Sequence, residues 1–245
     1  DVTSPGTSTA GVPTGWTAFN EGGPADIGSQ WAGGADYTTN TPLGGPADGN
    51  QYCYINMFNL GVTGGIYQDT EALQSNTVYT LTVAIGSRHD RVNSAGILSL
   101  LNGTNNLGAV LASVGGLPTA QNTWRDYSVT YTTGASIHGN LTIELSVPGN
   151  GTTIQADFDN VRLTKVAAVA PTMGVAKVVG GNLILTGTNG TPGTRYTWLV
   201  TTNLALPLSR WPTNRTGTLD GNGGFSNAVP MVTSQLANFF RLRLP

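Results

Sequence analysis

Charged residues and long hydrophobic runs are scarce in this sequence of 245 residues. Asp, Glu, Lys and Arg together make up 10% of the chain, far below the quarter that is typical of soluble domains. The formal net charge of −2 gives no reason to expect nucleic acid or an anionic membrane as a partner. No apolar run approaches the roughly 20 residues that a membrane-spanning helix needs.

Cysteine is also nearly absent, because Cys53 is the only one. Neither an intrachain disulfide nor a cysteine-based metal cluster can therefore form. Alternation within QYCYINMF turns Cys53 inward, as a small buried hydrophobe. The sequence contains no P-loop, dinucleotide fingerprint or nucleophile elbow, and no pair of carboxylates stands out as set across a cleft. We therefore predict that the protein is not an enzyme.

What the sequence does contain is glycine, with 34 residues, and many short segments in which apolar and polar residues alternate. Between residues 77 and 86, for example, Tyr79, Leu81, Val83 and Ile85 line one face. No segment of 12 residues has a helical period. Even spacing of such segments, with turn residues between them, predicts an all-β sandwich fold. The expected strands in the first part of the chain cover residues 51–58, 64–70, 77–86, 96–102, 107–114, 124–133 and 140–147.

The stretch 154–165, IQADFDNVRLTK, closes this series and has an internal irregularity. Its apolar residues lie at even positions up to Phe158 and at odd positions from Val161. One face cannot bury both sets without an extra residue, so we predict a β-bulge near Asp159–Asn160. Asp157 and Asp159 are two residues apart and therefore share a face. They are candidates for a structural calcium site completed by loop oxygens; alternatively, they hydrogen-bond to the backbone at the bulge.

A change of composition after this stretch predicts two domains. Residues 1–165 form the first, 166–172 a short linker rich in small residues, and 173–245 a smaller β-domain with a hairpin turn at DGNGG. Residues 16–50 are expected to form a long, loop-rich region.

The first domain resembles the galactose-binding-like jelly-roll modules of bacterial secreted proteins, including PEP-CTERM-type exported proteins. The resemblance rests on VPTGW, DGNQYCYIN, GGIYQ, NTVYTLTVAIGSR, WRDYSVTYTTG and DFDNVRLT, in that order. The second domain resembles a β-module of extracellular proteins from Verrucomicrobia-like bacteria, through GGNLILTGTNGTPGTRYTWLVTTNLALPLSRW and FFRLRLP. These resemblances imply an N-terminal jelly-roll β-sandwich followed by a smaller C-terminal β-sandwich. They also imply export, surface or matrix association and glycan contact.

One departure from the jelly-roll pattern concerns the N-terminus. The initial strand of such modules is missing, and its acidic residue, a frequent calcium ligand, is missing with it. A vacant sheet position suggests donor-strand addition by another chain, with Asp1, Val2 and Thr3 as assembly residues. The start at Asp1, without an initiator methionine, is expected for a processed secreted protein.

Four further residues are candidates for a ligand or partner surface, and one for an interface. Trp31 and Tyr37, placed in a glycine-rich loop, offer rings on which a sugar can stack. Arg88 and His89 belong to the charged cluster SRHDR, for which a solvated loop is the alternative interpretation. Trp211, just before a proline, is a candidate assembly residue.

Two functions follow from these observations. The first is a non-catalytic subunit of an extracellular filament, sheath or surface matrix that self-associates into a polymer through its N-terminal segment. The alternative is a carbohydrate-binding module that contacts a polysaccharide. Both place the protein outside the cell or on its surface, with no cofactor or with structural calcium.

Overall fold

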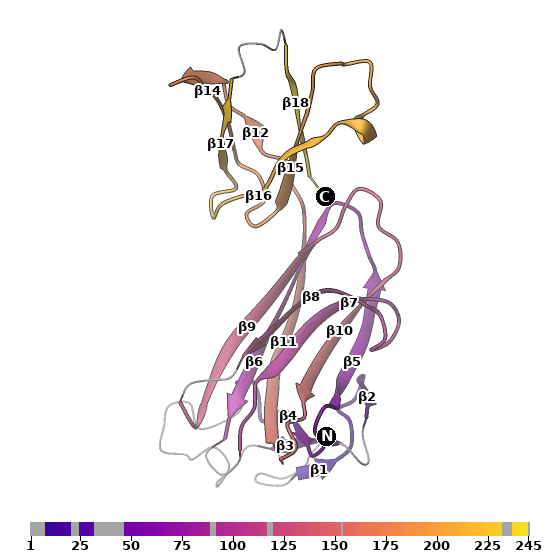
Figure 1. Cartoon of the computed structure of the whole chain (residues 1–245). Coiled ribbons are helices and arrows are strands. Elements are labelled where there is room, and N and C mark those ends of the chain that lie inside the picture. The colour runs from indigo at the N-terminus through magenta and orange to yellow at the C-terminus, as the bar shows by residue number, and fades with distance from the viewer. Residues whose placement is uncertain are drawn as a thin grey trace. The chain divides into compact units, whose positions relative to one another are not determined.

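The computed structural model describes residues 8–20, 25–31, 47–88, 92–116, 120–152, 154–231 and 237–244. The chain divides into two compact units (Figure 1). The first unit comprises Asp1–Leu73, Tyr79–Tyr131 and His138–Thr164. The second comprises Gln74–Val78, Thr132–Ile137 and Lys165–Pro245.

Two antiparallel sheets face each other in the first unit. The six-stranded sheet has the order β1 (Ser8–Ala10), β3 (Ala25–Trp31), β4 (Gln51–Met57), β11 (Ile154–Ala167), β6 (Thr77–Ser87) and β9 (Thr123–Thr132). The five-stranded sheet has the order β2 (Thr17–Phe19), β5 (Thr63–Ala72), β10 (Asn140–Pro148), β7 (Gly96–Asn102) and β8 (Ala109–Gly116). Neighbours in space are mostly distant in sequence, as in sandwiches of the jelly-roll kind.

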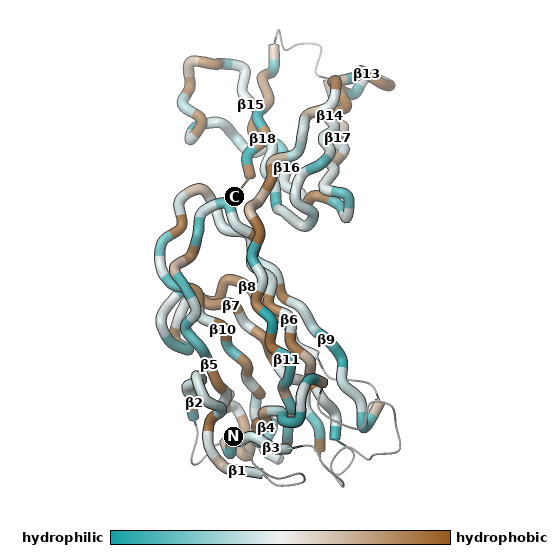
Figure 2. Tube along the Cα trace, turned by 180° about the vertical axis from the view of Figure 1, so that it is seen from behind, coloured by the Kyte–Doolittle hydropathy of each residue, from teal (hydrophilic) through white to brown (hydrophobic). Residues whose placement is uncertain are grey.

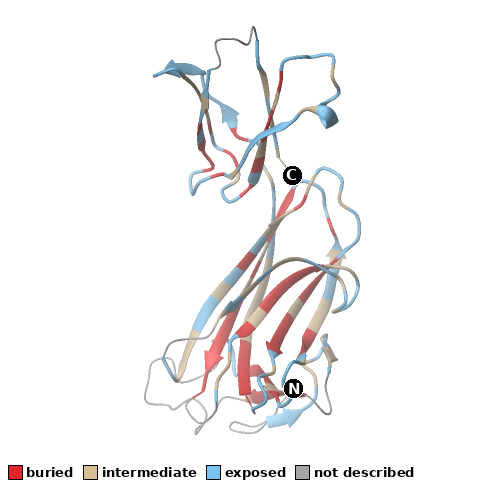
Figure 3. Ribbon diagram, in the orientation of Figure 1, coloured by how far each residue is buried: buried red, intermediate tan, exposed pale blue. Residues whose placement is uncertain are grey.

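The core of the first unit lies between these sheets. Along β10, hydrophobic and hydrophilic residues alternate (Figure 2), so that Leu141, Ile143, Leu145 and Val147 share the face that enters the core. Strands such as β7 and β10 are largely buried (Figure 3). The largest side chains that are less than 2% exposed are Tyr79, Phe158, Ile27, Ile55, Met57, Ile66, Leu81, Ile85, Leu98, Leu100 and Leu101. Among the described residues, no helix has the length and apolar character required to span a membrane.

The second unit is a smaller arrangement of two sheets. One contains β12 (Thr172–Met173), β13 (Lys177–Val179), β14 (Asn182–Thr188) and β17 (Phe225–Pro230), and the other has the order β16 (Thr213–Thr218), β15 (Arg195–Thr201) and β18 (Phe239–Arg243). A short 3₁₀ helix, η1, covers Leu208–Arg210. The buried cluster of this unit consists of Leu185, Tyr196, Trp198, Leu219 and Phe225.

The prediction of an all-β sandwich fold is confirmed. In the region 16–50, predicted to be rich in loops and without strand signals, the structure contains two strands, β2 and β3. Strand β3 reads ADIGSQW, with only Ile27 and Trp31 as large apolar residues, so its sequence has little strand character. Long-range pairing with β4 compensates for this weak local preference.

The N-terminal segment pairs within its own unit. Ser8, Thr9 and Ala10 pair with β3 at the edge of the six-stranded sheet. These residues thus occupy a sheet edge of their own chain. Asp1, Val2 and Thr3, the predicted assembly residues, lie outside the described residues.

The predicted irregularity in the last strand of the first unit coincides with a special backbone conformation. Asn160 has φ of 48°, in the left-handed region that asparagine tolerates better than most residues. It lies inside β11, between Phe158, which is buried, and Val161. A left-handed residue at this point lets both apolar sets of β11 face the core.

A glycine in β7 leaves room for the aromatic ring of β11, and its replacement should destabilise the first unit. A Cβ added at Gly96 would lie 2.6 Å from the Phe158 ring, so we expect Gly96→Ala to lower the free energy of unfolding by about 1–3 kcal/mol. Gly115→Ala, on the strand paired with β7, is the matched control, because its Cβ would meet atoms no closer than 3.4 Å. Urea denaturation measures both; equal midpoints would contradict the packing described.

Candidate functional site

The two faces of the sheet formed by β4 and β11 present different kinds of side chain. Antiparallel pairing sets Phe158 opposite Cys53 and Asp157 opposite Tyr54. Phe158 and Cys53 point between the sheets, where Gly96 of the other sheet lies close to the Phe158 ring. By alternation, Asp157 and Tyr54 point to the outer face of the six-stranded sheet. A solvent-facing sheet surface would be expected there, yet Asp157 is 0% exposed and Tyr54 is 8% exposed.

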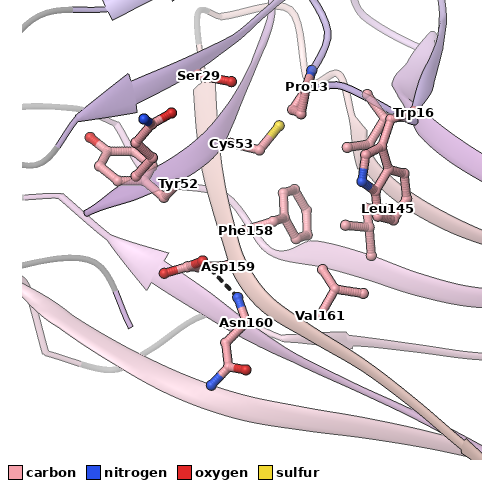
Figure 4. Close-up of a pocket in the computed structure, with 12 residues that line it drawn as sticks. Pro13, Trp16, Ser29, Tyr52, Cys53, Leu145, Phe158, Asp159, Asn160 and Val161 are labelled. Atoms are coloured by element: carbon pink, nitrogen blue, oxygen red, sulfur yellow. Dashed lines mark hydrogen bonds between the residues drawn. The ribbon is translucent and has the colours of Figure 1, made fainter. Parts of the chain in front are cut away.

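A pocket of about 230 Å³ opens where β4 and β11 cease to pair. Its walls are mainly apolar and aromatic, with a few polar groups (Figure 4). The Phe158 ring projects into it between Trp16 and Tyr52, and Asp159 lies at its margin (Figure 4). The lining residues are Pro13, Trp16, Ser29, Gln51, Tyr52, Cys53, Ile66, Leu145, Phe158, Asp159, Asn160 and Val161.

Asp159 is the carboxyl group of this pocket. Its Oδ1 accepts a hydrogen bond from the backbone N–H of Asn160 at 2.7 Å, and its Oδ2 accepts one from the backbone N–H of Asp48 at 2.8 Å. Burial raises the pKa of Asp159, while the bonds from Asp48 and Asn160 act in the opposite direction. The net shift is upward, so this carboxyl holds a proton to a higher pH than an ordinary aspartate.

The outer face beside the pocket is a buried polar cluster, which we call the outer-face cluster. Its members are Gln30, Tyr52, Tyr54, Arg88, Gln155 and Asp157, all less than 9% exposed. Gln155 Nε2 donates to Asp157 Oδ1 at 2.6 Å, and Arg88 Nη1 donates to Gln30 Oε1 at 2.8 Å. Arg88 follows β6 and Gln30 lies on β3, so this bond joins elements separated by β11 and β4 in the sheet order.

An aromatic group borders the same cluster. Tyr52 contacts Trp124 of β9 edge to face, with ring centroids 5.5 Å apart, and Trp124 packs against the buried cluster that Tyr52 forms with Tyr54. Buried polar groups cost stability unless they are hydrogen-bonded. A cluster of charged, amide and phenol groups on one sheet face is therefore typical of a functional site rather than of a stabilising core.

Cys53 is not a nucleophile in this site. Burial, followed by the negative charges of Asp157 and Asp159, raises the pKa of the Cys53 thiol. The thiol form therefore persists at neutral pH, and thiols react only weakly without ionisation.

Several predicted site residues lie elsewhere than expected. Trp31 ends β3, opposite Gln51, rather than lying in a loop. Arg88 is 4% exposed and belongs to the outer-face cluster, so the prediction of a surface residue is wrong. Trp211 donates its indole N–H to the Leu206 carbonyl at 2.9 Å within its own loop. Tyr37 and His89 lie outside the described residues.

Of the two roles considered for Asp159, backbone hydrogen bonding is the one observed. In the part of the chain that the structure describes, no three His, Cys, Asp or Glu side chains gather as a metal-binding group. Calcium binding at Asp157 and Asp159 stays a prediction.

The sequence reasoning missed Tyr52, Tyr54, Gln30 and Gln155 as site residues. A signal for two of them was available, because alternation in QYCYINMF turns Tyr52 and Tyr54 away from the core once Cys53 is turned inward. What the sequence does not reveal is that β4 pairs with β11, which sets these tyrosines beside the carboxylates.

Comparison with known proteins identifies the family of the chain that carries this site. A family model described as "HpiC1-like: HpiC1 cyclase" matches residues 2–164, which include the whole site and more than half of the chain. A search of curated proteins finds no match.

Three solved structures of cyclases resemble the chain. A cyclase from Fischerella sp. TAU is 25% identical, with a TM-score of 0.54 over 65% of this chain and 88% of the other. A structure of a cyclase from the same source in complex with 4-(1H-indol-3-yl)butan-2-one is 26% identical, with a TM-score of 0.54 over 65% and 89% of the two chains. An apo form of a cyclase from Fischerella sp. is 24% identical, with a TM-score of 0.56 over 68% and 90%.

Jelly-roll carbohydrate-binding modules also occur among the similar structures. A structure described as "CBM4 structure and function" is 15% identical, with a TM-score of 0.41, a likeness that supports no functional assignment. The narrower resemblances to PEP-CTERM-type and Verrucomicrobia-like modules stay predictions.

Two functional predictions are overturned by these findings. The chain is not assigned to a non-catalytic filament or matrix subunit, and the prediction that it is not an enzyme is wrong, because both the family model and the similar cyclase structures point to catalysis. The sequence misled because it contains none of the nucleotide-binding, His/Cys metal-binding or nucleophile motifs by which an enzyme is commonly recognised. The chain belongs to the HpiC1-like cyclase family.

Proposed function

We propose that the pocket at the end of β4 and β11 is the active site of a cyclase that acts on a substrate carrying an aromatic ring, with Asp159 as the proton-transferring group. The observation that carries this proposal is a carboxyl group of raised pKa at the margin of an aromatic pocket. Such a pairing of an apolar cavity with a pKa-shifted acid is characteristic of acid–base sites.

The walls of the pocket suit an aromatic substrate. Trp16, Tyr52 and Phe158 supply rings that pack against an aromatic group in offset or edge-to-face geometry. The similar Fischerella cyclase was solved in complex with an indole-bearing ketone, which supports the same class of ligand here. A cavity of about 230 Å³ suits a small ligand, since the pockets that bind drug-sized ligands have volumes of roughly 300–1,000 Å³.

Ring closure needs one proton to be delivered and one to be removed. In the proposed reaction, the Asp159 carboxyl gives its proton to one carbon of an alkene, and the other alkene carbon becomes cationic. A carbon of the aromatic ring attacks this cation, so that a new C–C bond closes the ring. The same ring carbon then loses its proton to the Asp159 carboxylate. The product is an isomer of the substrate, and the enzyme returns to its starting state.

The outer-face cluster supports this chemistry by holding the strands that carry the pocket. The bond from Arg88 to Gln30 and the bond from Gln155 to Asp157 fix side chains of β11 and β3 on either side of β4. Positioning to within fractions of an ångström accounts for a large part of catalysis by proximity. Arg88 and Gln155 are therefore positioning residues in this proposal.

The pocket is expected to bind 4-(1H-indol-3-yl)butan-2-one, used as a probe. Because Trp16 forms one wall, Trp16→Ala should weaken binding about tenfold, a loss of roughly 1.4 kcal/mol. Ligand-observed NMR measures the dissociation constant, and Trp211→Ala in the second unit is the control that should bind normally. Saturable binding that is equal in both variants would place the probe at another site.

Cyclisation of an indole that carries a tethered alkene should depend on Asp159. Asp159→Asn should lower the rate by about 10²–10⁴-fold, as expected for loss of a general acid, while probe binding remains. Because the pKa of Asp159 is raised and the protonated form is the active one, the rate should fall as the pH rises through that raised pKa. A rate that is unchanged in Asp159→Asn, with normal probe binding, would remove Asp159 from the mechanism and leave the pocket in place.

The same substitution should also loosen the turn at the pocket margin. Asparagine keeps one acceptor oxygen, so either the bond from Asp48 or the bond from Asn160 is lost. We expect Asp159→Asn to lower the free energy of unfolding by about 1–2 kcal/mol. The variant should therefore unfold at a lower denaturant concentration. Hydrogen exchange at the Asp48 and Asn160 amides checks the cause; unchanged protection at both amides would contradict the assigned contacts.

A further inference from the structure

The three-stranded sheet of the second unit has an outer face of arginine and threonine. Pairing sets Arg195 opposite Thr218, and Thr197 opposite both Thr216 and Arg243. Directly paired residues share a face of a sheet. Arg241 lies opposite Leu199, two residues from Thr197, and so joins the same face. We call these residues the arginine–threonine face: Arg195, Thr197, Thr216, Thr218, Arg241 and Arg243.

Around Arg195 and Thr197 this face points away from the core of the second unit, whereas Leu199, on the same side of β15, is 2% exposed. Tyr196 and Trp198, which alternate with Arg195 and Thr197, are buried in the core cluster. The three arginines are exposed. A shallow cavity of about 550 Å³ is lined by Arg195, Thr197, Thr216, Thr218 and Arg243, together with Tyr196, Gly217 and Leu244. The face is therefore hollowed and carries most of its polar groups at the cavity wall.

The charge of this face is not neutralised locally. Residues 166–245 contain six basic residues and one acidic residue, Asp220, although the whole chain has a net charge of −2. Asp220 Oδ1 accepts hydrogen bonds from the backbone N–H groups of Asn222 and Gly224 within its own turn. Within the described part of the chain, no carboxylate forms an ion pair with Arg195, Arg241 or Arg243.

We propose that the arginine–threonine face binds a linear anionic polysaccharide. Guanidinium groups form paired hydrogen bonds with carboxylate and sulfate groups, and threonine hydroxyls both donate to and accept from sugar hydroxyls. Single-stranded nucleic acid is less well matched, because bases stack on exposed aromatic rings, and Tyr196, the aromatic residue that lines the cavity, is buried in the core cluster. This inference is independent of the cyclase proposal, since it uses only residues of the second unit.

The test is retention of the intact protein on dextran sulfate and on alginate, with neutral dextran as the reference polymer, at low and at moderate salt. Binding to both anionic polymers and none to neutral dextran is expected, with weakening as salt screens the charges. The triple variant Arg195→Gln, Arg241→Gln, Arg243→Gln should bind at least about tenfold more weakly. If neither dextran sulfate nor alginate retains the protein at low salt, the proposal is overturned.

A matched variant distinguishes binding by this face from a general effect of the net charge. Lys177→Gln, Arg210→Gln, Arg215→Gln removes the same number of charges from the second unit but lies outside the face. Arg215 pairs with Trp198 and so lies on the opposite side of the sheet. This variant should bind like the unmodified protein. Equal loss in the two triple variants would overturn the assignment to the face, and tighter binding to single-stranded DNA than to either polysaccharide would overturn the ligand class.

Discussion

Strand β11 presents apolar side chains to the core on both sides of Asn160, and the left-handed conformation of that one residue makes this possible. Before Asn160 the even-numbered residues, including Phe158, face the core. After it, the odd-numbered residues, beginning with Val161, do so. The acidic residues at 157 and 159 are consequently kept out of the sandwich interior while staying next to it. The pocket forms at this change, where pairing with β4 ends.

The same constraint gives Asp159 the partly buried environment that the proposed proton transfer requires. A regular strand would turn Asp159 fully to one side, and its carboxyl would be either solvated or deeply buried. At the irregularity it is half-buried, held by backbone N–H groups of Asn160 and Asp48, and its pKa is raised. The outer-face cluster adds buried polar groups whose desolvation costs stability, which agrees with a site shaped for function.

The sequence predicts the fold well where local pattern and pairing agree. Strands such as β6 and β10 alternate strictly, and Asn160 lies within the two residues assigned to a bulge. It predicts poorly where pairing overrides local preference, as in β3, whose polar residues Gln30 and Ser29 are buried and pair with β4 and β1. Arg88 shows the same limit. A charged residue in SRHDR reads as solvated, and only the sheet order brings it within reach of Gln30.

The most direct test of the central claim is a ¹³C NMR titration of the Asp159 carboxyl carbon in the intact protein, assigned by comparison with Asp159→Asn. An ordinary aspartate titrates near a pKa of about 3.9. The account predicts a midpoint clearly above that value, which moves further when an aromatic ligand fills the pocket and excludes water. A midpoint at or below the ordinary value would mean that the backbone hydrogen bonds outweigh burial, and Asp159 would then be a purely structural anchor.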